Sequence, residues 1–208
     1  SVGGKTAINL RAGKNQLGCF HQPAAVICDT DTFSTLPERE VRSGSAEIIK
    51  YGVIGDEGFF ESLGEEPISA RYEAVVECCV SMKRDFVARD EFDRGDRRYL
   101  NFGHTIGHAI ESCAGGELLH GECVALGMLP MIEDKSLVRR TRAIYRTLGL
   151  PTRTGVDKNK VLSYMQHDKK SAGSTITVIK VPGLGCWRAD KIPMTELPAL
   201  LGIKENED

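Results

Sequence analysis

Three histidines close together in the sequence are the residues best suited to chemistry. His104 and His108 are four residues apart, and His120 follows after a short segment that contains glycines. On a helix, side chains four residues apart project from the same face, about one turn from each other. Zinc binds imidazole and carboxylate ligands readily, and a catalytic zinc keeps one coordination position open for substrate. Spacing alone therefore predicts that His104 and His108 are metal ligands, with core histidines that only satisfy backbone groups as the alternative.

Two other motif interpretations are disfavoured by neighbouring residues. The zinc-protease helix His-Glu-x-x-His has the same spacing, but Thr105 stands where the catalytic glutamate would be. Without that glutamate, the general base for hydrolysis is missing. The opening Gly3-Gly4-Lys5-Thr6 resembles the end of a nucleotide-binding P-loop, but the residues after it favour a strand and a turn instead of a helix.

Charged residues elsewhere could complete a site for an anion. Glu47 and Lys50 are three residues apart, which places them on one helix face and is also the pattern of a surface ion pair. Lys83 falls in the apolar stripe of a predicted helix, where a lysine either extends to solvent or binds an anion. Two basic pairs, Arg97-Arg98 and Lys169-Lys170, are solvated charge clusters if taken singly. If they converge on a metal, they predict a pocket for a small substrate that carries phosphate or carboxylate.

Composition excludes several classes of protein. The chain has 208 residues, 41% of them hydrophobic and 27% charged, which is typical of a soluble globular protein with one core or with a domain and part of another. A net charge of -2 argues against nucleic-acid binding, and no apolar run is long enough for a membrane span or a signal peptide. We therefore expect a cytoplasmic protein. The seven cysteines include no Cys-x-x-Cys pair, and we expect reduced thiols that serve as small core residues.

Hydrophobic patterns predict a mainly helical chain with short strands near both ends. Strands are expected at 6–10, followed by a loop at 11–15, and at 24–28, which would be buried. A hairpin is expected from 174–181 through a Pro-Gly turn to 186–188. Helices are expected at 38–63, 69–90, 101–113, 120–149 with a break near Pro130, and 157–167. The absence of an initiator Met and the start in a dense turn suggest a fragment.

Taken together, these segments resemble the 3-dehydroquinate synthase family from Ser1 to about Lys170. The elements that carry the resemblance occur in the expected order: Ser1-Val-Gly-Gly-Lys5-Thr-Ala-Ile-Asn, Gly13-Lys-Asn15, Ala46-Glu47-Ile-Ile-Lys50-Tyr-Gly, Lys83, Arg97, Leu100-Asn101-Phe-Gly-His104-Thr-Ile-Gly-His108-Ala, His120-Gly-Glu, and Asp168-Lys-Lys.

The resemblance implies a different ligand set from the one that spacing favours. It implies that Glu47, His104 and His120 hold Zn²⁺ or Co²⁺, while His108 faces the substrate. It also implies catalytic roles for Lys5, Lys50, Lys83, Arg97, Asn101 and His108. The same residues, with Asn15 and Lys169, would bind substrate, and Lys5, Lys14 and Asn15 would lie near the cofactor NAD. Asp93 departs from the family pattern, which has a glutamate there, and the shorter side chain reduces the reach toward Arg97.

The implied reaction converts 3-deoxy-D-arabino-heptulosonate 7-phosphate to 3-dehydroquinate and phosphate. It proceeds through transient oxidation by NAD, β-elimination, reduction and an aldol ring closure. The implied fold is that of the family's multi-helical metal- and substrate-binding domain at 38–208, with strands at 1–37 left from a nucleotide-binding α/β domain. The expected partners are an N-terminal NAD-binding domain and a second copy of the chain, so the fragment alone is expected to be inactive.

Three alternative functions remain. Cyclases that make deoxy-inosose or valiolone rings keep the histidine helix, but the presence of both Asn101 and His108 favours dehydroquinate formation. Metal-dependent glycerol or alcohol dehydrogenases share the two-domain plan, but their neutral substrates would leave Lys5, Lys83 and Arg97 without an anion. The third alternative is a stand-alone metal-binding or dimerisation module.

Overall fold

The structure is a computed structural model that describes residues 2–11, 13–168 and 174–203. The chain divides into two compact units, and each is described by itself. Unit 1 comprises Ser1–Thr35 and Ile68–Arg98, and unit 2 comprises Leu36–Pro67 and Tyr99–Asp208. The predicted division into 1–37 and 38–208 follows family architecture and stays a prediction. No helix in the described ranges is both long and apolar enough to span a membrane.

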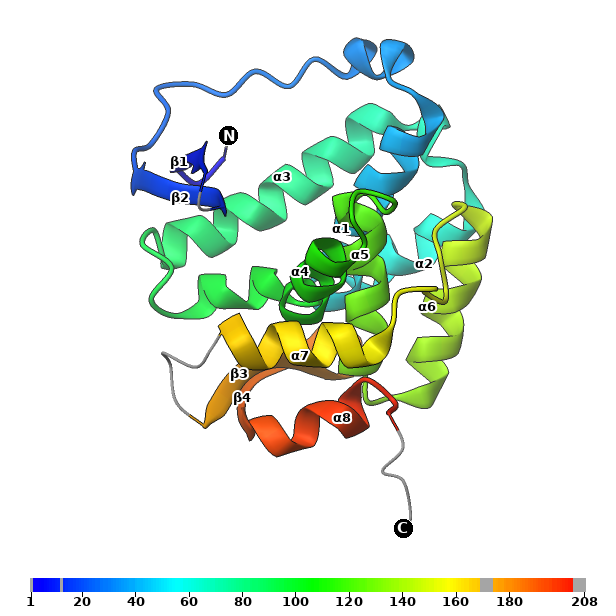
Figure 1. Cartoon of the computed structure of the whole chain (residues 1–208). Coiled ribbons are helices and arrows are strands. Elements are labelled where there is room, and N and C mark those ends of the chain that lie inside the picture. The colour runs from blue at the N-terminus through cyan, green and yellow to red at the C-terminus, as the bar shows by residue number, and fades with distance from the viewer. Residues whose placement is uncertain (1, 12, 169–173, 204–208) are drawn as a thin grey trace. The chain divides into compact units, whose positions relative to one another are not determined.

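Unit 1 begins with a β-hairpin. Strands β1 (Lys5–Leu10) and β2 (Gly13–Phe20) pair antiparallel, with Lys5 opposite Phe20 (Figure 1). The strand predicted at 6–10 is therefore confirmed, but the segment after it turns at once into a second strand. The buried strand predicted at 24–28 is wrong. Within the described residues this segment pairs with no strand, and Ile27 is 92% exposed, so the apolar run has no hydrogen-bonding neighbour to make it a strand.

The rest of unit 1 is helical. It consists of η1 (Thr30–Thr35), η2 (Ile68–Ala70) and the long α3 (Tyr72–Arg89). Val75 and Phe86 are the buried residues of α3, and the ring of Tyr72 packs edge-on against Phe33. Lys83 is half-buried on α3, in line with its place in the predicted apolar stripe.

Unit 2 contains the other major helices, which confirms the mainly helical fold. They are α1 (Glu38–Ile54), α2 (Glu57–Glu65), α4 (His104–Cys113), α5 (His120–Met128), α6 (Lys135–Thr147) and α7 (Lys158–Asp168). The short η3 (Asp96–Asn101) precedes α4, and its residues from Tyr99 onward belong to unit 2. The single helix predicted at 38–63 is divided in two. The backbone changes direction at Gly55, and the Asp56 side chain caps α2 by accepting a hydrogen bond from the Phe59 N–H at 2.6 Å. The break near Pro130 is confirmed, because η4 (Leu129–Met131) separates α5 from α6.

A second hairpin completes unit 2, as the β-branched run predicted. Strands β3 (Thr175–Gly183) and β4 (Cys186–Pro193) pair antiparallel, and η5 (Met194–Glu196) and α8 (Leu197–Leu200) follow. Two hydrogen bonds join the hairpin to the rest of unit 2. The Trp187 indole N–H donates to the Ile54 carbonyl of α1 at 3.1 Å, and the N–H of Glu133, just before α6, donates to the Val181 carbonyl at 2.9 Å.

The core of unit 2 is built around the contact between α4 and α5. Their backbones approach so closely that a Cβ added to Gly127 would lie 2.1 Å from the Gly103 carbonyl oxygen, and one added to Gly107 would lie 3.0 Å from the Cys123 carbonyl oxygen. On the far side of α5, the buried Tyr145 hydroxyl donates to the Ala125 carbonyl at 2.9 Å. Helices α4 and α5 therefore form one closely packed pair, and each begins with a histidine.

All seven cysteines are free, which confirms the prediction of reduced thiols. The prediction that they fill the core holds for Cys123, which is buried. It is wrong for Cys19, Cys28 and Cys186, which are exposed.

Gly127→Ala is expected to lower the free energy of unfolding by about 1–3 kcal/mol, because the new methyl group would overlap backbone atoms of α4. Urea unfolding followed by circular dichroism measures the change. Gly44→Ala is the matched control within α1, where an added Cβ meets nothing within 4 Å. Helix propensity predicts that this control is stabilised by up to about 1 kcal/mol. Equal effects of the two substitutions would contradict the backbone contact between α4 and α5.

Candidate metal centre

Helix α1 supplies a carboxylate and an ammonium group to the site. The Lys50 Nζ lies 2.5 Å from the Glu47 Oε2 and donates a hydrogen bond to the Leu100 carbonyl at 2.8 Å. The Lys50 side chain is only 5% exposed, so the pair is not the ordinary surface ion pair that the sequence left open. Because the Lys50 Nζ is held by two partners, the Glu47 carboxylate and the Leu100 carbonyl, its positive charge is fixed beside Glu47.

Two histidines meet the same carboxylate from the starts of two helices. The His104 Nε2 lies 3.2 Å from the Glu47 Oε1, and the His120 Nε2 lies 3.9 Å from the same atom. His104 follows Gly103, whose φ of 78° is a conformation that glycine adopts readily, and His120 is the first residue of α5. The close contact of α4 with α5 thus brings together histidines that are separated in sequence.

The other ring nitrogens of these two histidines have partners of their own. The His104 Nδ1 lies 3.0 Å from the Phe102 carbonyl oxygen, and the His120 Nδ1 lies 2.8 Å from the Glu111 Oε2. Both partners are acceptors, so each Nδ1 carries the proton and, in the neutral ring, each Nε2 is left with its lone pair. A carboxylate or carbonyl behind the ring is the arrangement that orients histidine ligands of metals. Glu47, His104 and His120 therefore offer one oxygen and two nitrogens suited to a divalent ion such as zinc.

His108 lies beside this group but differs from the other two histidines. One nitrogen from each of His104, His108 and His120 falls within 4.8 Å of the others, so a site made of three histidines is also geometrically available. His108 is more exposed than His104, and within the described residues its ring nitrogens have no hydrogen-bond partner. A histidine without an orienting acceptor behind it is better suited to meet a substrate than to hold a metal.

Charge at the centre is set by the surroundings of Glu47. Burial opposes ionisation of this carboxyl, but a His104 ring protonated at both nitrogens donates to it through Nε2. This hydrogen bond and the positive charge of Lys50 outweigh burial and hold the pKa of Glu47 well below its usual range. Glu47 is therefore an anion at neutral pH. The pKa of His108 is lowered by partial desolvation and by the neighbouring His104 and His120, so its ring is neutral and able to accept a proton.

A further ion pair, which the sequence did not reveal, supports the start of α5. Arg39 Nε and Nη2 donate to the two carboxylate oxygens of Glu122 at 3.1 and 2.8 Å, and Nη2 also donates to the Glu117 carbonyl. The Arg39 guanidinium holds the pKa of Glu122 below its usual range. Glu122 in turn accepts from the Leu119 N–H at 2.8 Å, one residue before His120. A glutamate three residues after the helix cap is a recognised signal for such a bond, whereas Arg39 is too far away in sequence to be predicted.

The other residues predicted for the site fall in both units. Asn101 is exposed at the end of η3 in unit 2, three residues before His104. In unit 1, Lys5 forms an ion pair with Asp93, the residue that replaces the expected glutamate. Arg97 is buried and donates through Nη1 to the Glu91 carbonyl at 2.6 Å, so the contact of Asp93 is with Lys5.

The remaining predicted residues are less informative. Asn15 has a φ of 54°, and its N–H donates to the Asn9 side chain at 3.0 Å. Lys83 is half-buried on α3. The side chain of Lys14 and all of Lys169 lie outside the described residues.

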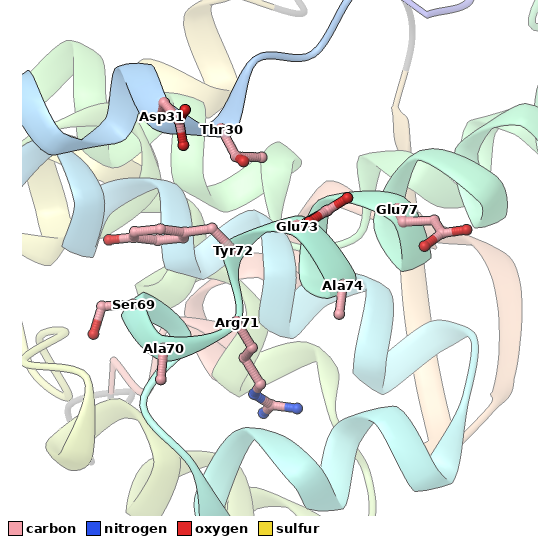
Figure 2. Close-up of a pocket in the computed structure, with 9 residues that line it drawn as sticks. All are labelled: Thr30, Asp31, Ser69, Ala70, Arg71, Tyr72, Glu73, Ala74 and Glu77. Carbon is pink, nitrogen blue, oxygen red and sulfur yellow. The ribbon is translucent and has the colours of Figure 1, made fainter.

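A cavity of about 450 Å³ in unit 1 is a poor candidate for an anionic substrate. It lies between η1 and the start of α3, and three of its lining residues are acidic: Asp31, Glu73 and Glu77. Figure 2 shows the Arg71 side chain pointing away from Glu73. The carboxylates would repel phosphate or carboxylate, so the metal centre in unit 2 remains the candidate site.

Comparison with known proteins points to one family. The family model described as "3-dehydroquinate synthase C-terminal" matches residues 44–171, and "3-dehydroquinate synthase N-terminal" matches residues 1–43. The 3-dehydroquinate synthase of Acidithiobacillus ferrooxidans is 46% identical over 89% of this chain and 55% of its own length. That of Streptococcus suis is 39% identical over 98% of this chain and 61% of its own length. The chain thus spans little more than half the length of these relatives.

Solved structures share the fold at low sequence identity. A 2-epi-5-epi-valiolone synthase from Streptomyces hygroscopicus, solved with NAD⁺ and Zn²⁺ bound, aligns with a TM-score of 0.82 and 24% identity over 96% of this chain and 61% of its own. A 2-deoxy-scyllo-inosose synthase, complexed with carbaglucose-6-phosphate, NAD⁺ and Co²⁺, aligns with a TM-score of 0.81 and 23% identity over 95% and 61%. These two structures show the fold of the described helices and strands.

Glu47→Gln is expected to weaken zinc binding by more than about 100-fold, because it removes the anionic oxygen between the two histidines, whereas His108→Ala should weaken it by less than about tenfold. Competition with a chromophoric chelator measures both affinities. A greater loss for His108→Ala would identify the three histidines as the ligand set instead.

Glu111→Gln is expected to weaken zinc binding by about 10- to 100-fold, because the amide no longer supplies a charged acceptor behind His120. Glu117→Gln, an exposed substitution between α4 and α5, is the control and should leave the affinity unchanged. If the two variants bound zinc equally well, Glu111 would have no orienting role.

Proposed function

The chain belongs to the 3-dehydroquinate synthase family, and we propose that it forms the metal- and substrate-binding part of such an enzyme. The proposed reaction converts 3-deoxy-D-arabino-heptulosonate 7-phosphate to 3-dehydroquinate and phosphate, with NAD and a divalent metal as cofactors. Relatives carry this name, and related solved structures were obtained with NAD⁺ and with Zn²⁺ or Co²⁺. The observation that carries the proposal is the meeting of His104 Nε2 and His120 Nε2 at the Glu47 carboxylate.

Glu47, His104 and His120 are the proposed holders of the metal. A divalent ion bound by them would act as a Lewis acid toward the substrate hydroxyl that is oxidised. Glu111 and the Phe102 carbonyl keep the two rings oriented through their Nδ1 atoms. Because these partners belong to the folded chain, the ligand atoms are arranged before any substrate arrives, which reduces the reorganisation that binding requires.

Lys50 is proposed to stabilise negative charge on the substrate. Its ammonium group is nearly excluded from water and is fixed by Glu47 and the Leu100 carbonyl. A charge in such a site interacts more strongly with an enolate or a carboxylate than it would in water. Asn101 and His108 are both exposed, and they lie before and after His104 in the sequence. Both are proposed to bind substrate hydroxyl groups, and His108 is proposed to exchange protons with them.

Four residues of unit 1, Lys5, Asn15, Lys83 and Arg97, are proposed to bind the phosphate and other polar groups of the substrate. Lys5, Lys14 and Asn15 are also proposed to lie near NAD, and Lys169 to contact the substrate. Arginine and lysine suit phosphate because they combine positive charge with several N–H donors. The family supports this assignment through the order of the motifs along the chain. The same proposal includes an N-terminal NAD-binding domain as partner, a homodimer and a cytoplasmic location.

Phosphate release provides the test. A protein that joins this chain to the NAD-binding part of the enzyme should release phosphate from the heptulosonate substrate when NAD and zinc are present. Lys50→Met, which keeps the length of the side chain but removes its charge, should lower kcat by about 100- to 1,000-fold. Lys135→Met, at an exposed position at the start of α6, is the control and should keep full activity.

Two outcomes would contradict the proposal. Steady reduction of NAD with glycerol, without phosphate release, would identify a dehydrogenase. Phosphate release from a hexose phosphate but not from the heptulosonate would identify a different sugar phosphate cyclase.

A further inference from the structure

Unit 2 contains a second cavity, on the side of α4 that faces away from the histidines. At 100° per residue, Ile106 and Ile110 project roughly opposite to His104 and His108. Together with Leu126 of α5 and Leu129 of η4, these isoleucines form an apolar floor under a cavity of about 430 Å³. All four of these side chains are at least nine-tenths buried. The volume is within the usual range for pockets that bind small molecules.

The rim of this cavity is positively charged. Arg142 of α6, Arg153 in the following loop and Lys158 at the start of α7 all line it, and its described lining residues include no aspartate or glutamate. Arg142 and Arg153 form no ion pair with any carboxylate in the part of the chain that the structure describes. The Lys158 Nζ donates to the neutral Gly202 carbonyl at 3.2 Å, which satisfies one of its donors without balancing its charge. Two threonines, Thr152 and Thr154, add further polar groups to the same rim.

An apolar floor below a cationic rim defines the class of ligand. Inorganic phosphate would pair with the cations but would leave the floor empty, and a neutral apolar molecule would cover the floor while leaving the cations unpaired. A small carboxylate attached to an apolar ring satisfies both, because guanidinium groups bind carboxylates through paired hydrogen bonds. We propose that this cavity, here called the α4 rear pocket, binds a small carboxylate with an apolar ring.

The α4 rear pocket is separate from the metal centre in its residues and its chemistry. Its floor shares α4 and α5 with the metal centre but none of the residues Glu47, His104, His108 or His120. The cavity in unit 1 of similar volume has three carboxylates in its lining and would repel the same ligand. Binding to the α4 rear pocket therefore needs neither metal nor heptulosonate, and it can be measured independently of the enzymatic proposal.

Calorimetric titration of the metal-free chain with 3-phenylpropionate tests the inference. Saturable binding with one site per chain is expected, and the matched neutral compound 3-phenylpropionamide should bind at least about tenfold more weakly. Arg142→Gln combined with Arg153→Gln should weaken binding of the carboxylate by about tenfold or more. Arg139→Gln combined with Arg146→Gln is the matched control, since both arginines lie on α6 outside the cavity lining, and it should bind as the wild type does.

Two further variants locate the ligand. Leu201→Trp places a bulky ring at the half-exposed edge of the cavity and should abolish binding, while His104→Ala should leave the affinity unchanged because His104 belongs to the metal centre. Circular dichroism confirms that each variant is folded. Equal affinity for the acid and the amide, unchanged binding in the Arg142/Arg153 variant, or no saturation up to about 10 mM would overturn the inference.

Discussion

The Glu47 carboxylate is the point on which the site depends. It is only partly exposed to water, and this partial burial by itself would favour the neutral acid. Lys50, on the next turn of the same helix, and His104, from the start of α4, reverse that preference by hydrogen bonding and charge. The charged Glu47 of α1 can serve as a metal ligand only because α4 and α5 bring His104 and His120 to it. An ion pair whose lysine is buried in this way contributes little net stability, so its presence is better explained by the chemistry it allows.

The three histidines have different surroundings, and those surroundings suggest different tasks. His104 and His120 each have an acceptor behind the ring, whereas His108 has none among the described residues. An acceptor that binds the Nδ1–H of a histidine makes the Nε2 of the same ring more basic and restricts rotation of the ring. His108 lacks such an acceptor and has a neutral ring, which is compatible with its proposed exchange of protons with a substrate. Equal spacing on one helix face therefore does not imply equal function.

Much of the fold follows from sequence patterns, and the exceptions have physical reasons. Helical periodicity predicted the major helices, because an apolar face must repeat at the helical period wherever a helix packs. Pro130 predicted the break in the segment 120–149, because proline removes a helical hydrogen bond. It did not predict the division at Gly55, where a local cap by Asp56 ends a pattern that could have continued. The segment 24–28 has the composition of a strand, but a strand also needs a neighbour, and composition contains no information about neighbours.

The candidate site was predictable in its residue types but not in its pairings. His104 and His108 were visible through their spacing, and Glu47 was connected to them only by family resemblance, since its partners are far away in sequence. Glu111 and Arg39 were missed for the same reason: their contacts arise from the packing of α1, α4 and α5, and a single sequence does not reveal such distant contacts.

Glycines at the contact of α4 with α5 also affect how the protein tolerates sequence change. Because Gly107 and Gly127 bring backbone against backbone, the separation of the two helices is set by main-chain atoms and not by the sizes of interlocking side chains. The separation of His104 and His120, which begin these two helices, therefore depends little on the volumes of apolar side chains elsewhere in the core. At Gly127 a single added methyl group would overlap the Gly103 carbonyl oxygen, so this position accepts no larger residue unless the two helices move apart.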